Sequence, residues 1–222
     1  MIRPWQRGLY AVTDPGLIAP PDLAAQVGAA IAGGAALVQY RDKEASDSQR
    51  LVCARALLAV CHDHRVPLII NDDIALAVAV GADGVHLGRD DAQPAAARQR
   101  LGPHAIIGVS CYNDLPRAMT AAEAGADYVA FGRFFPSRTK PRAIQADIET
   151  LRRAKQRLTV PLVAIGGITA DNGAALIASG ADLLAVIHGI FGHEDVTAAT
   201  RSIAELFDDA AVDRQRKAFG IQ

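Results

Sequence analysis

Three observations predict a single-domain α/β protein. The 222 residues fit the roughly 200–250 that a (β/α)₈ barrel takes as one unit. Half of them are hydrophobic, which allows a large core. Apolar segments alternate with Ala-rich helical ones eight times, and each apolar segment is continuous, as in parallel strands buried on both faces. A (β/α)₈ TIM barrel follows most simply. A doubly wound open sheet is the alternative, but neither a Gly-x-Gly-x-x-Gly motif nor a P-loop follows the first strand.

The elements alternate strictly along the chain. Strands are expected near Leu9–Thr13, Leu37–Tyr40, Leu68–Asn71, Gly84–Leu87, Ile106–Ser110, Tyr128–Phe131, Leu162–Ile165 and Leu183–Ile187. Helices are expected over Asp22–Ala32, Ser48–His64, Ile74–Val80, Pro94–Leu101, Leu115–Ala124, Gln145–Leu158, Asn172–Ser179 and Val196–Phe207. The barrel is therefore expected to occupy residues 1–207, and the polar segment 208–222 is expected to form a C-terminal tail.

A repeated unit supports these boundaries. Variants of Gly-Ala-Asp followed by an apolar run begin at Gly33, Gly81, Gly125 and Gly180. Each ends an Ala-rich helix with glycine, turns through a small residue or Asp, and enters a strand. Glycine is the usual residue just after a helix because it adopts positive φ without penalty.

The stretch Ile69–Asp91 shows how two successive units work. β-Branched Ile69 and Ile70 suit a buried strand, and the acids after Asn71 stop it and can cap a helix. The helix that follows is too apolar for a surface helix, so it is expected to pack flat on the sheet. The next strand ends in acids again, and two neighbouring parallel strands therefore both finish in carboxylates, Asp72 and Asp91.

Composition excludes several classes of protein. The net charge of −1 argues against a general nucleic-acid or membrane binder. The N-terminus lacks a signal-peptide pattern, and no apolar run approaches the roughly 18 residues of a membrane span. Three cysteines, an odd number, suit a reducing cytoplasm, with Cys53 and Cys61 as core residues. We expect a soluble cytoplasmic protein, and a homo-oligomer is compatible with the sequence.

The residues that follow the strands gather charge at one end of the barrel, which is the active face of such folds. Gln39, Arg41 and Lys43 alternate along an extended segment, so their side chains share one direction. With Lys140 they supply three cations and an amide. The carboxylates Asp72 and Asp91 suit Mg²⁺, which commonly takes one or two protein carboxylates and completes its shell with substrate phosphate. The set predicts a site for a metal-bound polyphosphate.

A second anion site is expected after strands seven and eight. Gly166-Gly167 and His188-Gly189 stand where many barrels bind a phosphomonoester through backbone N–H groups. Ser137 and Thr139 on the long loop Gly132–Pro141 add hydroxyl donors. One metal-assisted and one metal-free anion site suggest an enzyme that joins two phosphorylated small molecules while pyrophosphate leaves.

Ordinary structural roles account for other polar residues. Asp42, Asp73 and Asp90 are expected to act as caps or as groups outside the site. His86 lies within a strand and is expected to be a hydrogen-bonded core histidine rather than a ligand. No His-x-x-x-His or Cys-x-x-Cys spacing supports zinc, and Cys111 has no evident histidine partner for a catalytic thiol.

These residues resemble the thiamine-phosphate synthase family over nearly the whole chain, from Gly8 to about Phe191. The motifs that carry the resemblance are LVQYRDK (Leu37–Lys43), LIINDD (Leu68–Asp73), GADGVHLGRDD (Gly81–Asp91), GVS (Gly108–Ser110), FGRFFPSRTK (Phe131–Lys140) and VAIGGIT (Val163–Thr169). The family couples 4-amino-2-methyl-5-hydroxymethylpyrimidine pyrophosphate to a thiazole phosphate, giving thiamine phosphate and pyrophosphate.

The resemblance implies a role for each matching residue. Asp72 and Asp91 would hold Mg²⁺. The pyrimidine pyrophosphate would be bound by Gln39, Tyr40, Arg41, Asp42, Lys43, Asn71, Ser110 and Lys140. The thiazole phosphate would be bound by Ser137, Arg138, Thr139, Gly167, Ile187 and His188. Arg41, Lys43, Ser110 and Lys140 would act on the reacting groups. The resemblance further implies a dissociative reaction, in which pyrophosphate leaves before the thiazole nitrogen attacks.

Two positions depart from the family pattern. Ser137 stands where the family often has Thr, which keeps the hydroxyl, and His188 stands where Ser or Gly is usual. Two other functions are compatible with a phosphate-binding barrel. A thiazole tautomerase of the same fold, which handles only the thiazole phosphate, would not need the full charged set, which comprises Arg41, Lys43, Asp72, Asp91 and Lys140. A non-catalytic phosphate sensor would need a partner surface or an attached domain, and the sequence suggests neither.

Overall fold

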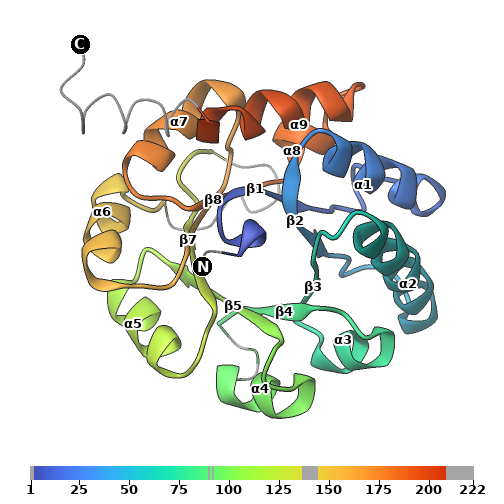
Figure 1. Ribbon diagram of the computed structural model, residues 1–222, viewed down its shortest axis with the longest axis horizontal. Coiled ribbons are helices and arrows are strands. Elements are labelled where there is room, and N and C mark those ends of the chain that lie inside the picture. The colour runs from blue at the N-terminus through green and yellow to red at the C-terminus, as the bar shows by residue number, and fades with distance from the viewer. Residues whose placement is uncertain (1–2, 90, 92, 137–144, 209–222) are drawn as a thin grey trace.

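The structure, a computed structural model, describes residues 3–89, 91, 93–136 and 145–208. Each strand pairs in parallel with the next one in the chain and the eighth pairs with the first, so the sheet closes into a barrel surrounded by helices (Figure 1). The strands are β1 (Gly8–Val12), β2 (Ala35–Tyr40), β3 (Leu68–Asn71), β4 (Gly84–Leu87), β5 (Ile106–Tyr112), β6 (Tyr128–Gly132), β7 (Leu162–Ile165) and β8 (Leu183–Val186).

The helices follow the expected order. They are α1 (Leu23–Ala32), α2 (Asp47–Asp63), α3 (Ile74–Val80), α4 (Pro94–Leu101), α5 (Leu115–Glu123), α6 (Ile148–Arg157), α7 (Ala170–Ala178), α8 (His188–Phe191) and α9 (Val196–Ala204), with 3₁₀ turns η1 (Pro4–Gln6) and η2 (Pro20–Asp22). The predicted (β/α)₈ barrel is confirmed. Several bounds differ from those expected. The four-residue helix α8 was not expected, and α6 begins later than predicted because Asp147 caps it. The helix expected over Val196–Phe207 ends as α9 at Ala204, α7 begins two residues earlier than expected, and β5 runs two residues further, to Tyr112.

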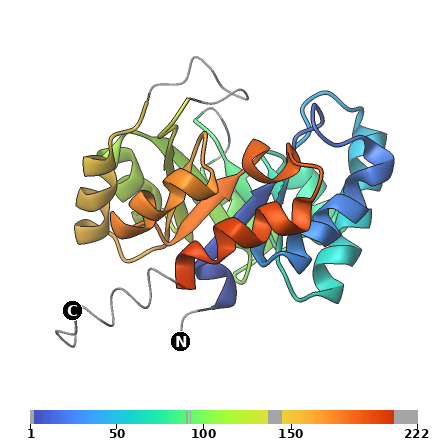
Figure 2. The same cartoon turned by 90° about the horizontal axis from the view of Figure 1, so that it is seen from above.

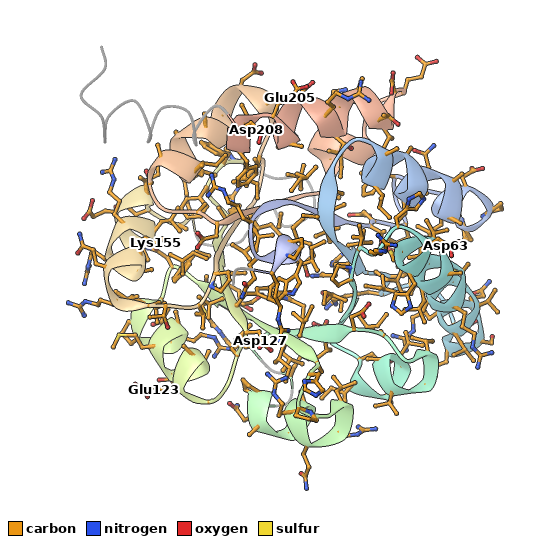
Figure 3. The ribbon with its side chains drawn as sticks, in the orientation of Figure 1. Asp63, Glu123, Asp127, Lys155, Glu205 and Asp208 are labelled. Atoms are coloured by element: carbon orange, nitrogen blue, oxygen red, sulfur yellow. The ribbon has the colours of Figure 1, made fainter. Side chains whose placement is uncertain are left out.

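The repeated Gly-Ala-Asp unit has a physical basis. In the later three copies the aspartate accepts a hydrogen bond from the first residues of a neighbouring strand, at 2.8–2.9 Å: Asp83 from Leu68 N, Asp127 from Ile107 N and Asp182 from Leu162 N. A basic side chain pairs with each carboxylate from outside, as Lys155 does at 2.6 Å. Figure 3 labels Lys155 on α6 and Asp127 beside the strands. These contacts fix where the strands begin, and hence where their carboxyl ends lie.

Two apolar layers hold the barrel. The larger lies between strands and helices and includes Leu57, Phe131 and Leu151. The smaller fills the barrel interior with residues such as Leu37, Ile69 and Tyr128. Trp5 on η1 packs edge-on against Tyr128 with the ring centroids 6.3 Å apart. The turn η1 directly precedes β1 and lies under the barrel in Figure 2. It therefore closes the amino end of the barrel and leaves the carboxyl end for a site.

Three other expectations concern membrane-spanning helices, the cysteines and the C-terminal tail. Within the described residues, no helix is long and apolar enough to cross a membrane. The three cysteines are free. Of the two expected core residues, Cys61 is buried as predicted and Cys53 is only partly buried; Cys111 is buried as well. Of the predicted polar tail, only Asp208 belongs to the part that the structure describes, so the tail stays a prediction.

Candidate active site

A cavity of about 590 Å³ opens among the segments that follow the strands. Strand ends or the loops after them contribute its lining, as expected for the active face of this fold. The predicted site residues that line it are Gln39, Arg41, Lys43, Asn71, Asp72, Asp91, Ser110, Gly167, Ile187 and His188. The structure therefore brings ten sequence-distant candidates to one cavity, from six strand ends.

The two expected metal ligands lie next to each other. The carboxyl groups of Asp72 and Asp91 are close enough to share a hydrogen bond. Asp91 is held by the Gly88 N–H, 2.5 Å from its Oδ2 atom. Asp72 has φ of +62°, a region that non-glycine residues rarely adopt. Its N–H donates to the His86 carbonyl, which ties the turn after β3 to β4.

The pKa values of these two carboxyl groups shift in opposite directions. Burial raises the pKa of Asp72, but the ion pair with Lys43 and the hydrogen bond with Asp91 outweigh burial, so its pKa is lowered. Burial also raises the pKa of Asp91. The hydrogen bond from the Gly88 N–H lowers this pKa and the neighbouring Asp72 carboxylate raises it further, so that the pKa of Asp91 is raised overall. Two carboxylates that compete for one proton form an oxygen-rich site suited to a hard divalent cation.

The cations near this pair come from the segment after β2. Lys43 Nζ lies 2.7 Å from Asp72 Oδ2, and Arg41 Nη1 lies 4.0 Å from Asp14 Oδ2. Thr13 at the end of β1 fixes Arg41 by accepting its backbone N–H at 2.9 Å. The predicted alternation of Gln39, Arg41 and Lys43 is confirmed, because all three side chains line the cavity.

The intervening residues of that segment lie elsewhere. Tyr40 is buried in the layer between strands and helices and its side chain does not line the cavity; its role in substrate binding stays a prediction. Asp42 lines a neighbouring hollow of about 490 Å³, and its Oδ1 accepts the N–H groups of Glu44 and Ala45 at 2.9 and 3.0 Å. Asp42 thus shapes a turn, as expected of a cap. It does not line the cavity, and the pyrophosphate contact that the family resemblance implies for it stays a prediction.

Asp73 is also structural, as expected. Its Oδ1 accepts the Leu76 N–H at 2.8 Å and caps α3. Its Oδ2 pairs with Arg50 at 3.0 Å, and Arg50 also pairs with Asp47 at 2.7 Å. Four predicted site residues, Ser137, Arg138, Thr139 and Lys140, and the expected cap Asp90 lie outside the described residues.

The glycines after β7 have a packing role that the sequence did not reveal. Gly166 and Gly167 have φ of +107° and +63°. A Cβ atom on Gly166 would overlap Arg133, and one on Gly167 would overlap the Pro136 carbonyl. These glycines therefore let the loop after β7 lie directly against the loop after β6, at the cavity wall.

His188 begins the short helix α8 and lines the cavity. Its ring lies so close to Gly192 that a Cβ atom there would come within 2.7 Å of Nδ1. The imidazole is therefore accommodated by the small residue that caps the C-terminus of its own helix. This placement answers how a larger residue fits at the position where the family pattern has Ser or Gly.

Sequence reasoning missed several cavity residues. They are Tyr10, Arg89, Tyr112, Arg133 and His193. His86 is buried and hydrogen-bonded, as expected of a core histidine, and it also borders the cavity. The Arg89 guanidinium lies over the Tyr112 ring, 4.6 Å from its centroid. Arg89 follows β4 at the carboxyl end of the barrel, so its place in the sequence could have indicated that it lines the cavity.

The predicted magnesium site passes a chemical test. Its two carboxylates come from different strand ends, adjoin each other and face a cavity that also holds cations. Within the part of the chain that the structure describes, no group of three or more His, Cys, Asp and Glu residues forms a metal cage. Two carboxylates fit Mg²⁺ completed by substrate phosphate and water.

Comparison with known proteins gives one consistent result. A family model described as thiamine monophosphate synthase matches residues 9–190. The thiamine-phosphate synthase of Nitrosococcus oceani is 51% identical over 201 residues, 90% of this chain and 93% of that protein. The one from an Azoarcus species is 54% identical over 201 residues, 90% and 97% of the two chains. A solved structure of thiamine phosphate pyrophosphorylase from Pyrococcus furiosus has 34% identity and a TM-score of 0.83, covering 92% and 97%.

Proposed function

The chain belongs to the thiamine-phosphate synthase family, and from that premise we propose that its cavity couples 4-amino-2-methyl-5-hydroxymethylpyrimidine pyrophosphate to a thiazole phosphate. The products are thiamine phosphate and pyrophosphate, and the reaction is a step of thiamine biosynthesis. One observation carries the proposal: the adjacent carboxylates Asp72 and Asp91 line a cavity together with Lys43 and Arg41. This combination suits a pyrophosphate that brings a divalent cation with it.

The residues divide the work of the first step. Asp72 and Asp91 would hold Mg²⁺, which supplies positive charge to the phosphate oxygens of the leaving group. Lys43 and Arg41, with Lys140 from the loop after β6, bind the remaining oxygens and stabilise the charge that develops on them. Gln39, Asn71 and Ser110 bind the pyrimidine pyrophosphate. The C–O bond to pyrophosphate breaks first and leaves a pyrimidine methylene cation.

The second step needs less from the protein. The thiazole ring nitrogen carries a lone pair and no proton, so it attacks the cation without a general base. Gly167, Ile187 and His188, with Ser137, Arg138 and Thr139, hold the thiazole phosphate, and a bound anion at this end of the barrel fixes the direction of attack. The enzyme therefore acts by orientation and by charge stabilisation.

Two other functions fit the fold less well. A thiazole tautomerase would bind one phosphate and would leave Lys43, Asp72 and Asp91 without a role. A phosphate sensor would not need a carboxylate pair placed among cations. The free thiols and the small-molecule substrates suit the cytoplasm. Whether the enzyme acts as a monomer or as a homo-oligomer does not alter this assignment, because the proposed residues all come from one chain.

Pyrophosphate release tests the proposal. Purified protein is incubated with pyrimidine pyrophosphate and Mg²⁺, with and without the thiazole phosphate, and both pyrophosphate and thiamine phosphate are measured. We expect both products only when Mg²⁺ and both substrates are present. Tight binding of thiazole phosphate without release of pyrophosphate would instead support the tautomerase or the sensor.

A further inference from the structure

A line of five hydrogen-bonded side chains crosses the barrel interior. Gln39 Nε2 lies 2.6 Å from the Tyr10 hydroxyl, which lies 2.7 Å from the Tyr128 hydroxyl. The Tyr128 hydroxyl lies 2.9 Å from His86 Nδ1, and His86 Nε2 lies 2.9 Å from Ser110 Oγ. Both ends of the line, Gln39 and Ser110, face the cavity.

The first contact fixes the direction of all the others. An amide nitrogen donates and does not accept, so Gln39 donates to Tyr10. Tyr10 is 1% exposed, and its own proton goes to Tyr128, which in turn donates to His86 Nδ1. Because Nδ1 accepts, the neutral ring carries its proton on Nε2 and donates to Ser110 Oγ. The hydroxyl proton of Ser110 is then directed away from His86.

Ser110 is fixed on its backbone side as well. Arg117 Nε donates to the Ser110 carbonyl at 2.9 Å, and Arg117 also donates to the Gly88 carbonyl at 3.1 Å. The end of β5 is thus tied to the segment that presents Asp91. Because the backbone and the side-chain oxygen of Ser110 are both held, its hydroxyl proton points toward the cavity.

The packing around Tyr128 shows that the line is built into the barrel. Gly108 lies on β5 directly beside the Tyr128 ring, and a Cβ atom there would overlap the ring and its hydroxyl. The His86 ring stacks on Tyr128 at an interplanar angle of 20° with the centroids 5.6 Å apart. Glycine at position 108 therefore makes room for the tyrosine that orients His86.

We propose that His86 is a positioning residue: through its Nε2–H tautomer it holds the Ser110 hydroxyl as a fixed hydrogen-bond donor to the pyrimidine pyrophosphate. This inference rests on the proposed function for the identity of the substrate. A donor that is oriented before the reaction stabilises charge on the leaving group without reorganising. Gln39, at the far end, sets the direction of the line.

The Nε2–H tautomer of His86 excludes a nucleophilic role for Ser110. A histidine 2.9 Å from a serine is the geometry of an activated nucleophile, as in a hydrolase. In such a pair the histidine accepts the serine proton, and its other nitrogen donates to an orienting group. Here the orienting group is the Tyr128 hydroxyl, which receives its own hydrogen bond from Tyr10 and donates to Nδ1. Ser110 therefore donates to substrate and does not attack it.

Two substitutions at one position separate positioning from structure. His86→Gln places an amide N–H near the position of Nε2, so it keeps the contact with Ser110. His86→Asn reaches the position of Nδ1 and the Tyr128 hydroxyl but falls short of Ser110. We expect His86→Asn to lower kcat about tenfold or more, with the KM for thiazole phosphate within about twofold, while His86→Gln stays within about threefold of the wild type. Equal losses in both variants, in step with a lowered Tm, would overturn the proposal.

A spectroscopic measurement tests the tautomer without any substrate. The ¹⁵N shifts of the two ring nitrogens distinguish Nε2–H from Nδ1–H imidazole, and comparison with His86→Gln protein assigns the His86 signals among the six histidines. We expect Nε2–H; an Nδ1–H ring would reverse the line and overturn the proposal. Covalent labelling of Ser110 by a fluorophosphonate, lost in His86→Asn, would overturn it too. A wild-type protein that makes no thiamine phosphate would refute the proposed function. The ¹⁵N measurement of the His86 tautomer would still test the direction of the hydrogen bonds from Gln39 to Ser110.

Discussion

Lys43 Nζ lies 2.7 Å from Asp72 Oδ2, and this ion pair joins the segment after β2 to the turn after β3 at the edge of the cavity. The Lys43 side chain is half exposed, so the pair itself adds little to stability. The pair matters for the reaction instead, because Asp72 is available to a cation and Lys43 to the phosphate that the cation binds. Asp72 holds Lys43 in place until the substrate arrives.

Asp72→Asn removes the charge and keeps the shape of the side chain. We expect turnover to fall more than about tenfold at saturating Mg²⁺, since the stabilisation lost is of the order of 1.5–3 kcal/mol. Asp47→Ala is the matched control, because Asp47 pairs with Arg50 beside the site but does not line the cavity. Steady-state release of pyrophosphate measures both variants, and a normal rate in Asp72→Asn would contradict the site assignment.

Asp91→Asn is expected to separate stability from activity. An amide at position 91 relieves repulsion with Asp72, and its nitrogen can donate to that carboxylate. Without Mg²⁺ the Tm should therefore rise by about 1–3 °C. The Mg²⁺ concentration for half-maximal activity should increase by about tenfold or more, since one of the two proposed ligands is lost. Thermal unfolding with and without Mg²⁺ measures the first effect; a lower Tm in metal-free buffer would show that the two carboxylates do not repel each other.

His188→Gly should change binding more than chemistry. The ring lies at the cavity and packs against Gly192, so its loss alters the proposed site for the thiazole phosphate and leaves the pyrophosphate site intact. We expect a KM change for thiazole phosphate larger than the change in kcat. His62→Ala, which loses an exposed pair with Asp83, is the control. If the KM is unchanged, His188 does not belong to the site.

The positions of the strand ends could be predicted because they depend on local sequence. The glycine that ends a helix and the aspartate that follows it recur, and the contacts of Asp83, Asp127 and Asp182 show why. The strict alternation of an extended segment also placed Gln39 and Arg41 correctly. The same alternation turns the Tyr40 side chain to the opposite face, because successive residues of an extended segment point in opposite directions.

Other parts of the site depend on contacts between distant residues. Tyr10 and Tyr128 are 118 positions apart, and nothing in either local sequence indicates that their hydroxyl groups meet. The reason for Gly166 and Gly167 is equally non-local, since the atoms that exclude a side chain belong to Arg133 and Pro136. Single-sequence patterns predict which residues reach the carboxyl face, but only the closed barrel shows which of them touch.

The buried thiols predict a loss of stability at alkaline pH. Burial raises the pKa of Cys61 and of Cys111 from 9.0 to about 12. Above pH 9 the unfolded chain releases these protons while the folded chain retains them, so the free energy of unfolding falls as pH rises. The slope is about 1.4 kcal/mol per pH unit for each thiol between pH 9 and pH 12. Below pH 9 the contribution is fully present.

Urea unfolding at a series of pH values between about 8 and 10 measures this slope. The window ends near pH 10 because the pKa values of Tyr10, Tyr40 and Tyr128 are also raised by burial, and these side chains add their own loss above it. Cys61→Ala and Cys111→Ala each cost stability at every pH through the cavity that they leave. Only the slope identifies the thiols: each variant should lose about half of the wild-type decline, and an unchanged slope in the double variant would show that the thiols titrate normally.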